Sequence, residues 1–83
     1  MANYNMKIDD FLYNDPSQIV KFLTRSDFEI VLRTLPNNID SLEVLEILLM
    51  NFEVEEFYEY CCVIRDETNL RVEFFEKEYG KSI

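Results

Sequence analysis

The fold is indicated most directly by residues 26–49, which read SDFEIVLRTLPNNIDSLEVLEILL. Two capping boxes lie in this stretch, because Ser26 is followed three residues later by Glu29, and Asp40 by Glu43. In such a box the first side chain accepts a hydrogen bond from the backbone N–H three residues later. The glutamate side chain in turn accepts one from the backbone N–H of the first residue. The stretch therefore predicts two helices, and the proline between them ends the first.

Apolar residues recur three or four positions apart after each of these starts, as they do on the buried face of a helix. They are Phe28, Val31, Leu32 and Leu35 in the first segment, and Leu42, Leu45, Leu48 and Leu49 in the second. An earlier helix is indicated where Asp15 precedes Pro16, because proline is tolerated at the first helical position. A short helix around Met6 to Tyr13 is expected before that one.

The C-terminal third of the chain has a less uniform pattern. Asn51 can cap a fourth helix over 52–65, with two glutamates in its favourable first turn. The apolar stripe of this helix would consist of Val54, Phe57, Tyr58, Cys61 and Cys62. Residues 57–65 also suit a strand, which leaves a hairpin of 57–65 with 70–78 as the alternative. The pattern leaves the structure of residues 70–79 open.

These features predict an all-α fold, with one domain over residues 1–83 built as a compact bundle of four to five short helices. The alternative is an α+β fold that ends in the hairpin just described. A chain of 83 residues has a narrow stability margin, which a partner chain can widen. A homodimer is therefore one possible state.

Acidic residues dominate the charge balance. Eight Lys and Arg against 17 Asp and Glu give −9, of which residues 1–52 contribute 4 − 8 = −4 and the shorter segment 53–83 contributes 4 − 9 = −5. Direct binding to nucleic acid needs a basic patch, so this balance argues against it. It favours a basic protein surface as the partner, because opposite charges steer association.

Catalytic and metal-binding patterns are absent from the sequence. There is no histidine, and the adjacent Cys61 and Cys62 cannot close a useful disulfide loop or form a zinc-binding pair. Neighbouring carboxylates on a helix do not face each other, so they form no acid–base pair. We therefore expect no enzymatic activity, no cofactor and no metal.

The sequence also bears on localisation. Met1 to Asn14 lacks a basic leader with a long apolar run, and with two unpaired cysteines this favours the cytoplasm. No apolar run approaches the length of a membrane span.

The predicted binding surface is the outer face of the fourth helix. Glu55, Glu56 and Glu59 would lie there opposite the apolar stripe, with Tyr60 projecting beside them as an aromatic anchor. Further acids at Glu73, Glu76 and Glu78 would extend this surface. A row of carboxylates can imitate a phosphate backbone. The predicted function is therefore inhibition of a nucleic-acid-binding protein, as small acidic proteins of phages and mobile elements do.

A second functional hypothesis comes from a faint resemblance. The segment Leu23–Phe28 with Leu32 and Arg33, followed by Ile39–Glu43, is similar to the start of the Hha/YmoA family. The similarity covers about a quarter of the chain and consists largely of residues that begin helices. Members of that family are small helical proteins that modulate a bacterial nucleoid-associated silencer. The resemblance implies, as the alternative, a helical co-regulator that joins a transcription or nucleoid protein complex.

Overall fold

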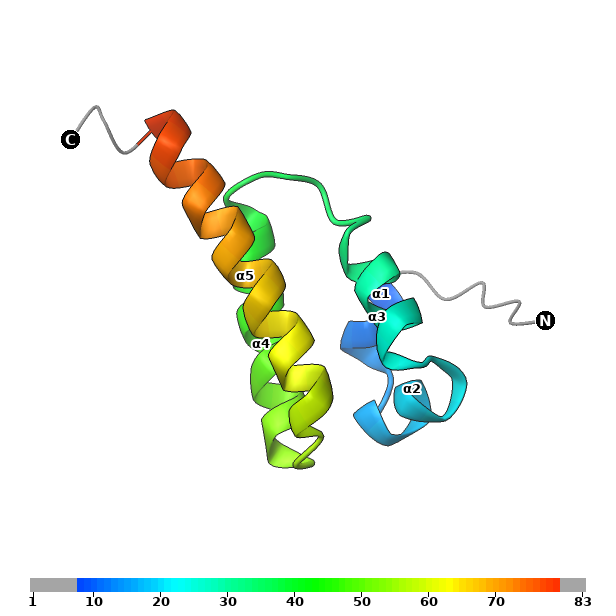
Figure 1. Ribbon diagram of the computed structural model, residues 1–83. Coiled ribbons are helices and arrows are strands. Elements are labelled where there is room, and N and C mark those ends of the chain that lie inside the picture. The colour runs from blue at the N-terminus through cyan, green and yellow to red at the C-terminus, as the bar shows by residue number, and fades with distance from the viewer. Residues whose placement is uncertain (1–7, 80–83) are drawn as a thin grey trace.

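Over residues 8–79, the part that the computed structural model describes, the chain forms five helices and no strand (Figure 1). Its helices are α1 Ile8–Tyr13, α2 Pro16–Phe22, α3 Arg25–Leu32, α4 Asp40–Val54 and α5 Tyr58–Tyr79. The predicted all-α bundle is confirmed. The hairpin alternative is wrong, because α5 runs without interruption through both of its proposed strands and their turn. The start of the helix expected at Met6 lies outside the described residues.

The two long helices, α4 and α5, form an antiparallel pair, and α1, α2 and α3 gather on one side of it (Figure 1). Helix α3 packs against α5, and α1 packs against α4. The apolar residues between the two groups form one continuous core. Its buried members are Phe11, Ile19, Leu23, Phe28, Val31, Leu32, Leu35, Leu45, Leu48, Phe52, Cys61 and Ile64.

Phe28 lies at the centre of this core. Its ring centroid is 4.9 Å from that of Phe11 on α1, 5.1 Å from that of Phe52 on α4 and 5.2 Å from that of Tyr60 on α5. These separations lie in the range that aromatic pairs prefer. One side chain of α3 therefore holds three other helices together.

Short polar side chains begin helices α2, α3 and α4. The Asp15 carboxylate accepts a hydrogen bond from the Ser17 backbone N–H before Pro16, as the sequence predicts. Helix α3 begins earlier than the predicted Ser26 cap, because the Thr24 hydroxyl accepts from the Asp27 N–H at 3.2 Å. Helix α4 begins at Asp40, but its cap comes from a residue outside it: the Asn38 side chain accepts from the Ser41 N–H at 3.1 Å.

The boundary predicted at Asn51 is wrong, because α4 continues through that residue to Val54. Phe52 is fully buried and extends the stripe of Leu45 and Leu48 at helical spacing, so packing favours an uninterrupted helix. The predicted helix 52–65 is thus divided between the end of α4 and the start of α5. The connection between them spans only residues 55–57.

Helix α4 ends in a Schellman motif. Glu56 has φ 63°, the left-handed conformation that glycine usually supplies at this position. The Phe57 N–H donates to the Phe52 carbonyl at 3.1 Å, and the Glu56 N–H donates to the Glu53 carbonyl at 3.0 Å. The Phe57 and Phe52 rings also pack edge to face, 6.3 Å apart. These bonds fix the sharp turn from which α5 starts.

Replacing Glu56 by glycine is expected to stabilise the protein by about 1 kcal/mol, because a side chain in the left-handed region costs about that much. Urea unfolding followed by circular dichroism measures the change. Glu55→Gly is the matched control, since Glu55 has φ −86° and gains nothing from glycine. Equal destabilisation by both changes would contradict the assignment of the strain to Glu56.

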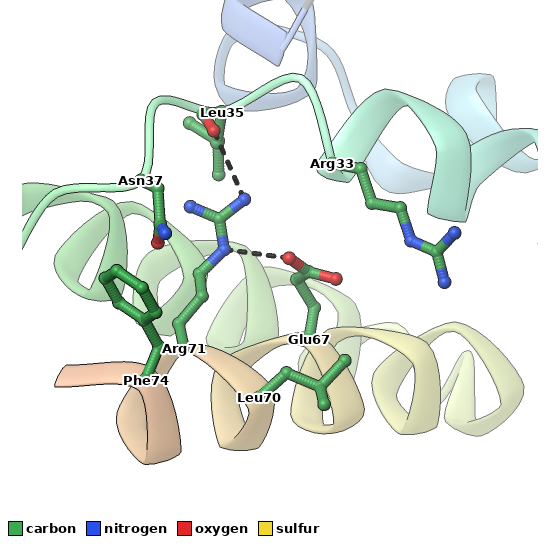
Figure 2. A pocket seen from close by; sticks show the side chains of 7 residues that line it. All are labelled: Arg33, Leu35, Asn37, Glu67, Leu70, Arg71 and Phe74. Atoms are coloured by element: carbon green, nitrogen blue, oxygen red, sulfur yellow. Dashed lines mark hydrogen bonds and ion pairs between the residues drawn. The ribbon is translucent and has the colours of Figure 1, made fainter. Parts of the chain in front are cut away.

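A buried ion pair fastens the connection between α3 and α4 to α5. The Arg71 Nε donates to the Glu67 carboxylate at 2.8 Å, and both side chains are buried. The remaining guanidinium nitrogens donate to three backbone carbonyls in and after α3, at distances of 2.9–3.3 Å. The acceptors are the carbonyls of Leu32, Leu35 and Pro36. Figure 2 shows the Arg71 guanidinium reaching from α5 to this connection. We call this arrangement the Arg71 clamp.

Candidate functional site

The turn between α4 and α5 carries a shallow hollow with acidic and aromatic walls. Its volume is about 270 Å³. The residues that line it are Glu56, Phe57, Tyr58, Glu59 and Tyr60. The Schellman motif places the first two, and the first turn of α5 places the other three. Three of the predicted binding residues therefore meet in one place, although the sequence predicted a continuous helix there.

The three glutamates at this turn differ in their surroundings. Glu55 and Glu56 are exposed in the connection, and no ion pair involves them among the described residues. Glu59 lies in the first turn of α5, where its carboxylate is 3.3 Å from an Arg25 guanidinium nitrogen. Both partners of that pair are largely exposed, so the pair adds little stability and can exchange for another cation.

Tyr60 does not project from the polar side of a helix, so that expectation was wrong. It is half-buried and its ring packs against Phe28 and Phe52. Its hydroxyl donates a hydrogen bond to the Leu23 carbonyl at 2.8 Å, which ties α5 to the end of α2. Tyr60 therefore contributes a wall to the hollow and also a structural bond.

Burial, and then the nearby Glu59 carboxylate, raise the pKa of the Tyr60 hydroxyl above its ordinary value near 10. The neutral, donating form is thus favoured in the folded protein. The stability that this preference contributes is complete below pH 10. It is lost as the pH rises through the raised pKa.

The remaining predicted acids are exposed, but they lie far along α5. Glu73 is fourteen residues after Glu59, which corresponds to about 21 Å along a helix at 1.5 Å per residue. Glu76 and Glu78 lie further on, in the last turns. The structure therefore brings Glu56, Glu59 and Tyr60 together, with Glu55 next to them in the connection, and leaves Glu73, Glu76 and Glu78 as a separate group.

Two residues of the hollow were placed in the core by the sequence pattern. Phe57 is only half-buried, and Tyr58 is exposed. Val54 and Cys62, from the same predicted stripe, are exposed as well. The stripe assumed one helix through residues 54–62, and the turn at 55–57 changes the direction of every side chain after it. Residues 56–60 read EFYEY, so glutamates and aromatic residues are interspersed there. This local pattern is the sequence feature that indicates a surface both acidic and aromatic.

No match to known proteins is found. The chain matches no protein-family model, no curated protein and no solved structure. Function must therefore be inferred from the chemistry of the protein surface.

Other parts of the described chain show fewer features of a functional site. No three His, Cys, Asp or Glu side chains are grouped closely enough to hold a metal ion within this part. Cys61 is buried, and burial followed by the Glu53 charge raises the pKa of its thiol, so it packs as an apolar residue. None of helices α1–α5 is long and apolar enough to cross a membrane.

A second hollow, of about 360 Å³, lies beside the Arg71 clamp (Figure 2). Leu70 and Phe74 form one side of it, and Arg33 points away from the Arg71 guanidinium. The charged groups of Glu67 and Arg71 are engaged within the chain. No buried side-chain nitrogen or oxygen lacks a partner among the described residues. The charged groups beside this hollow are therefore already paired within the protein.

Proposed function

We propose that the protein is a non-enzymatic binding protein whose α4–α5 turn docks on a basic surface of another protein, of the kind that handles nucleic acid. The observation that carries this proposal is the acidic, aromatic hollow at the turn. A net charge of −9 supports it, because the whole molecule then attracts a basic partner before contact.

The chemistry of the hollow suits a lysine or arginine side chain. Carboxylates at Glu56 and Glu59 supply acceptors for charge-assisted hydrogen bonds. Tyr58 and Phe57 supply aromatic rings, over whose faces a cation is attracted. Tyrosine at an exposed turn is also typical of protein interfaces.

The backbone adds a second argument. Glu56 occupies a left-handed conformation in which glycine is more stable, so its side chain brings a cost to the fold. Strained positions of this kind cluster at functional sites. A charged residue at a position that favours glycine is consistent with a role for that charge in binding.

Acidic residues on α5 can extend the contact. Glu59, Asp66 and Glu73 are seven residues apart, so they share one face of the helix at steps of about 10 Å. That face lies away from the buried Cys61 and Ile64. Such a row of negative charges can occupy a groove that otherwise holds a nucleic acid backbone.

The test removes the charge at the turn without changing its shape. The variant with Glu55→Gln, Glu56→Gln and Glu59→Gln is expected to bind a captured partner at least tenfold more weakly than the parent, a loss of about 1.4 kcal/mol. Its helix content should match that of the parent. Binding of the parent should weaken as salt rises from about 50 to 200 mM, because exposed charges are screened.

A matched control carries Glu73→Gln, Glu76→Gln and Glu78→Gln. Both triple variants have a net charge of −9 + 3 = −6, so they differ only in where charge is lost. We expect the control to bind more tightly than the turn variant. Equal binding by the two variants would show that only net charge matters, and would refute a docking site at the turn.

Competition separates inhibition from co-regulation. An inhibitor that occupies the nucleic acid site should be displaced from its partner by a DNA duplex. A co-regulator of a transcription or nucleoid complex should instead form a ternary complex with partner and DNA. Native mass spectrometry of the mixture distinguishes these two outcomes.

A further inference from the structure

Helix α4 carries apolar residues on its outer side as well as on its buried side. Nine of its fifteen residues are apolar, and they are Leu42, Val44, Leu45, Ile47, Leu48, Leu49, Met50, Phe52 and Val54. Helix α4 is covered where it meets α5 and the N-terminal helices, and nothing among residues 8–79 covers the side that carries Ile47, Met50 and Val54.

The outer face of α4 is an exposed apolar ridge. Ile47, Met50 and Val54 follow one another at i, i+3 and i+7, so they share a face, and their exposed fractions are 44%, 58% and 79%. The buried residues Leu45, Leu48 and Phe52 occupy the opposite side. Nothing in the core requires an apolar residue at these three outer positions.

An apolar groove between α4 and α5 adjoins this ridge. It has a volume of about 420 Å³, and Leu42, Leu49 and Val72 form its apolar walls. Arg65, Thr68 and Asn69 line the α5 side, where the Arg65 guanidinium is already paired with Glu53. Glu46 also lines the groove and precedes Met50 by four residues, so it lies between groove and ridge. Ridge and groove therefore lie side by side on α4.

The charges on α4 identify the kind of helix that fits. Helix α4 carries acidic residues but no Lys or Arg. Glu43 and Glu46 are both exposed, and each lies one turn before a ridge residue, Ile47 and Met50 respectively. A partner with Lys or Arg beside its apolar residues would pair with these carboxylates.

A second copy of this chain fits poorly. Two copies related by a twofold axis would place α4 against α4, because such an interface uses the same patch on both. The glutamates of each copy would then face those of the other. Each copy also carries a net charge of −9, so their approach is opposed at long range.

We infer that the outer face of α4, together with the α4–α5 groove, binds a basic amphipathic helix of a partner protein. Ile47 and Met50 contact the apolar stripe of that helix, and Glu43 and Glu46 pair with its flanking Lys or Arg. This surface is separate from the hollow at the α4–α5 turn, so the inference stands without the proposed function.

The experiment uses a defined peptide of about 18 residues, long enough to form a helix when bound. It carries leucines on one face and lysines on the other. Titration of the isotope-labelled protein is expected to shift the amide signals of residues 42–50 and 65–72. A second peptide with glutamate in place of lysine should not bind, and a third with glutamine in place of leucine should bind at least tenfold more weakly.

Two double variants, made at pairs of apolar residues with similar exposed fractions, test where the peptide binds on the protein. Ile47→Gln with Met50→Gln should weaken binding of the lysine peptide at least tenfold. Leu70→Gln with Phe74→Gln removes an apolar pair of similar exposure, 58% and 41%, and should leave binding unchanged. The turn variant with Glu55, Glu56 and Glu59 replaced by glutamine should also retain binding at about 0.15 M salt, where distant charges are screened. Failure of the proposed function is thereby distinguishable from failure of this inference.

Several results would overturn the inference. Equal loss of binding in both double variants, or amide shifts confined to the turn, would place the peptide elsewhere. Tight binding of the glutamate peptide would remove the argument from charge. Sedimentation of the free protein as a dimer that Ile47→Gln with Met50→Gln converts to a monomer would show that a second copy covers this face.

Discussion

Replacing Arg71 by alanine is expected to lower the free energy of unfolding by about 3–5 kcal/mol, the usual result of breaking a buried ion pair from one side. The change leaves the Glu67 carboxylate buried without its counter-charge. It also removes the donors from the carbonyls of Leu32, Leu35 and Pro36, which Arg71 now satisfies. For a chain of 83 residues the whole stability is about 4–12 kcal/mol, so this single change would remove a large share of it.

The chain offers a closely matched control for this prediction. Glu29 and Arg33 form a second ion pair at the same i, i+4 spacing and in the same order, but both side chains are exposed. Arg33→Ala should therefore cost no more than about 1 kcal/mol. Urea denaturation followed by circular dichroism measures both. Equal costs for Arg71→Ala and Arg33→Ala would mean that the clamp is not a buried pair in solution.

Replacing Phe28 alone by alanine should lower the free energy of unfolding by about 3–5 kcal/mol. The Phe28 ring is fully buried and contacts aromatic rings on α1, α4 and α5. Truncation leaves a cavity that three helices would have to move to fill, and packed helices relax only in part. Loss of these ring contacts removes a favourable aromatic interaction in addition to the buried area.

Phe22→Ala serves as the comparison for the core substitution. Phe22 ends α2 only six residues earlier, but its side chain is mostly exposed. Its removal should change stability by less than about 0.5 kcal/mol. Thermal melts of the two variants test the difference. A Phe28→Ala protein that melts with the parent would show that the aromatic contacts are not the centre of the core.

The helical class and most of the core could be predicted from the sequence, because local signals and packing agree there. Around α2 the capping aspartate, the proline and the apolar spacing all indicate the same helix. Around Asn51 they conflict: asparagine favours a helix start, whereas Phe52 continues the buried stripe of α4. Burial of a large aromatic ring outweighs a cap that contributes about 1 kcal/mol.

The candidate site could be predicted only in part, because it depends on a turn and on long-range contacts that local patterns do not indicate. Glu56 and Glu59 line one hollow, but through a turn that no glycine marks in the sequence. Tyr60 was assigned to the surface because a single helix over 52–65 would have turned it outward. Its position depends on a hydrogen bond to Leu23, 37 residues earlier, and no local pattern reports such a contact. The sequence does not predict the Arg71 clamp, because most of its acceptors are backbone carbonyls. Every residue has such a carbonyl, so the order of side chains does not indicate which ones Arg71 contacts.

The neighbouring cysteines have a practical consequence. Successive side chains on a helix point about 100° apart, so Cys61 enters the core while Cys62 faces solvent from the same turn of α5. Burial keeps the Cys61 thiol protonated and inaccessible, whereas Cys62 is open to reagents. The natural sequence thus contains one selective attachment point for a maleimide fluorophore. It lies three residues, or about one helical turn, after Glu59, so a dye there would be close to the turn at which we propose docking.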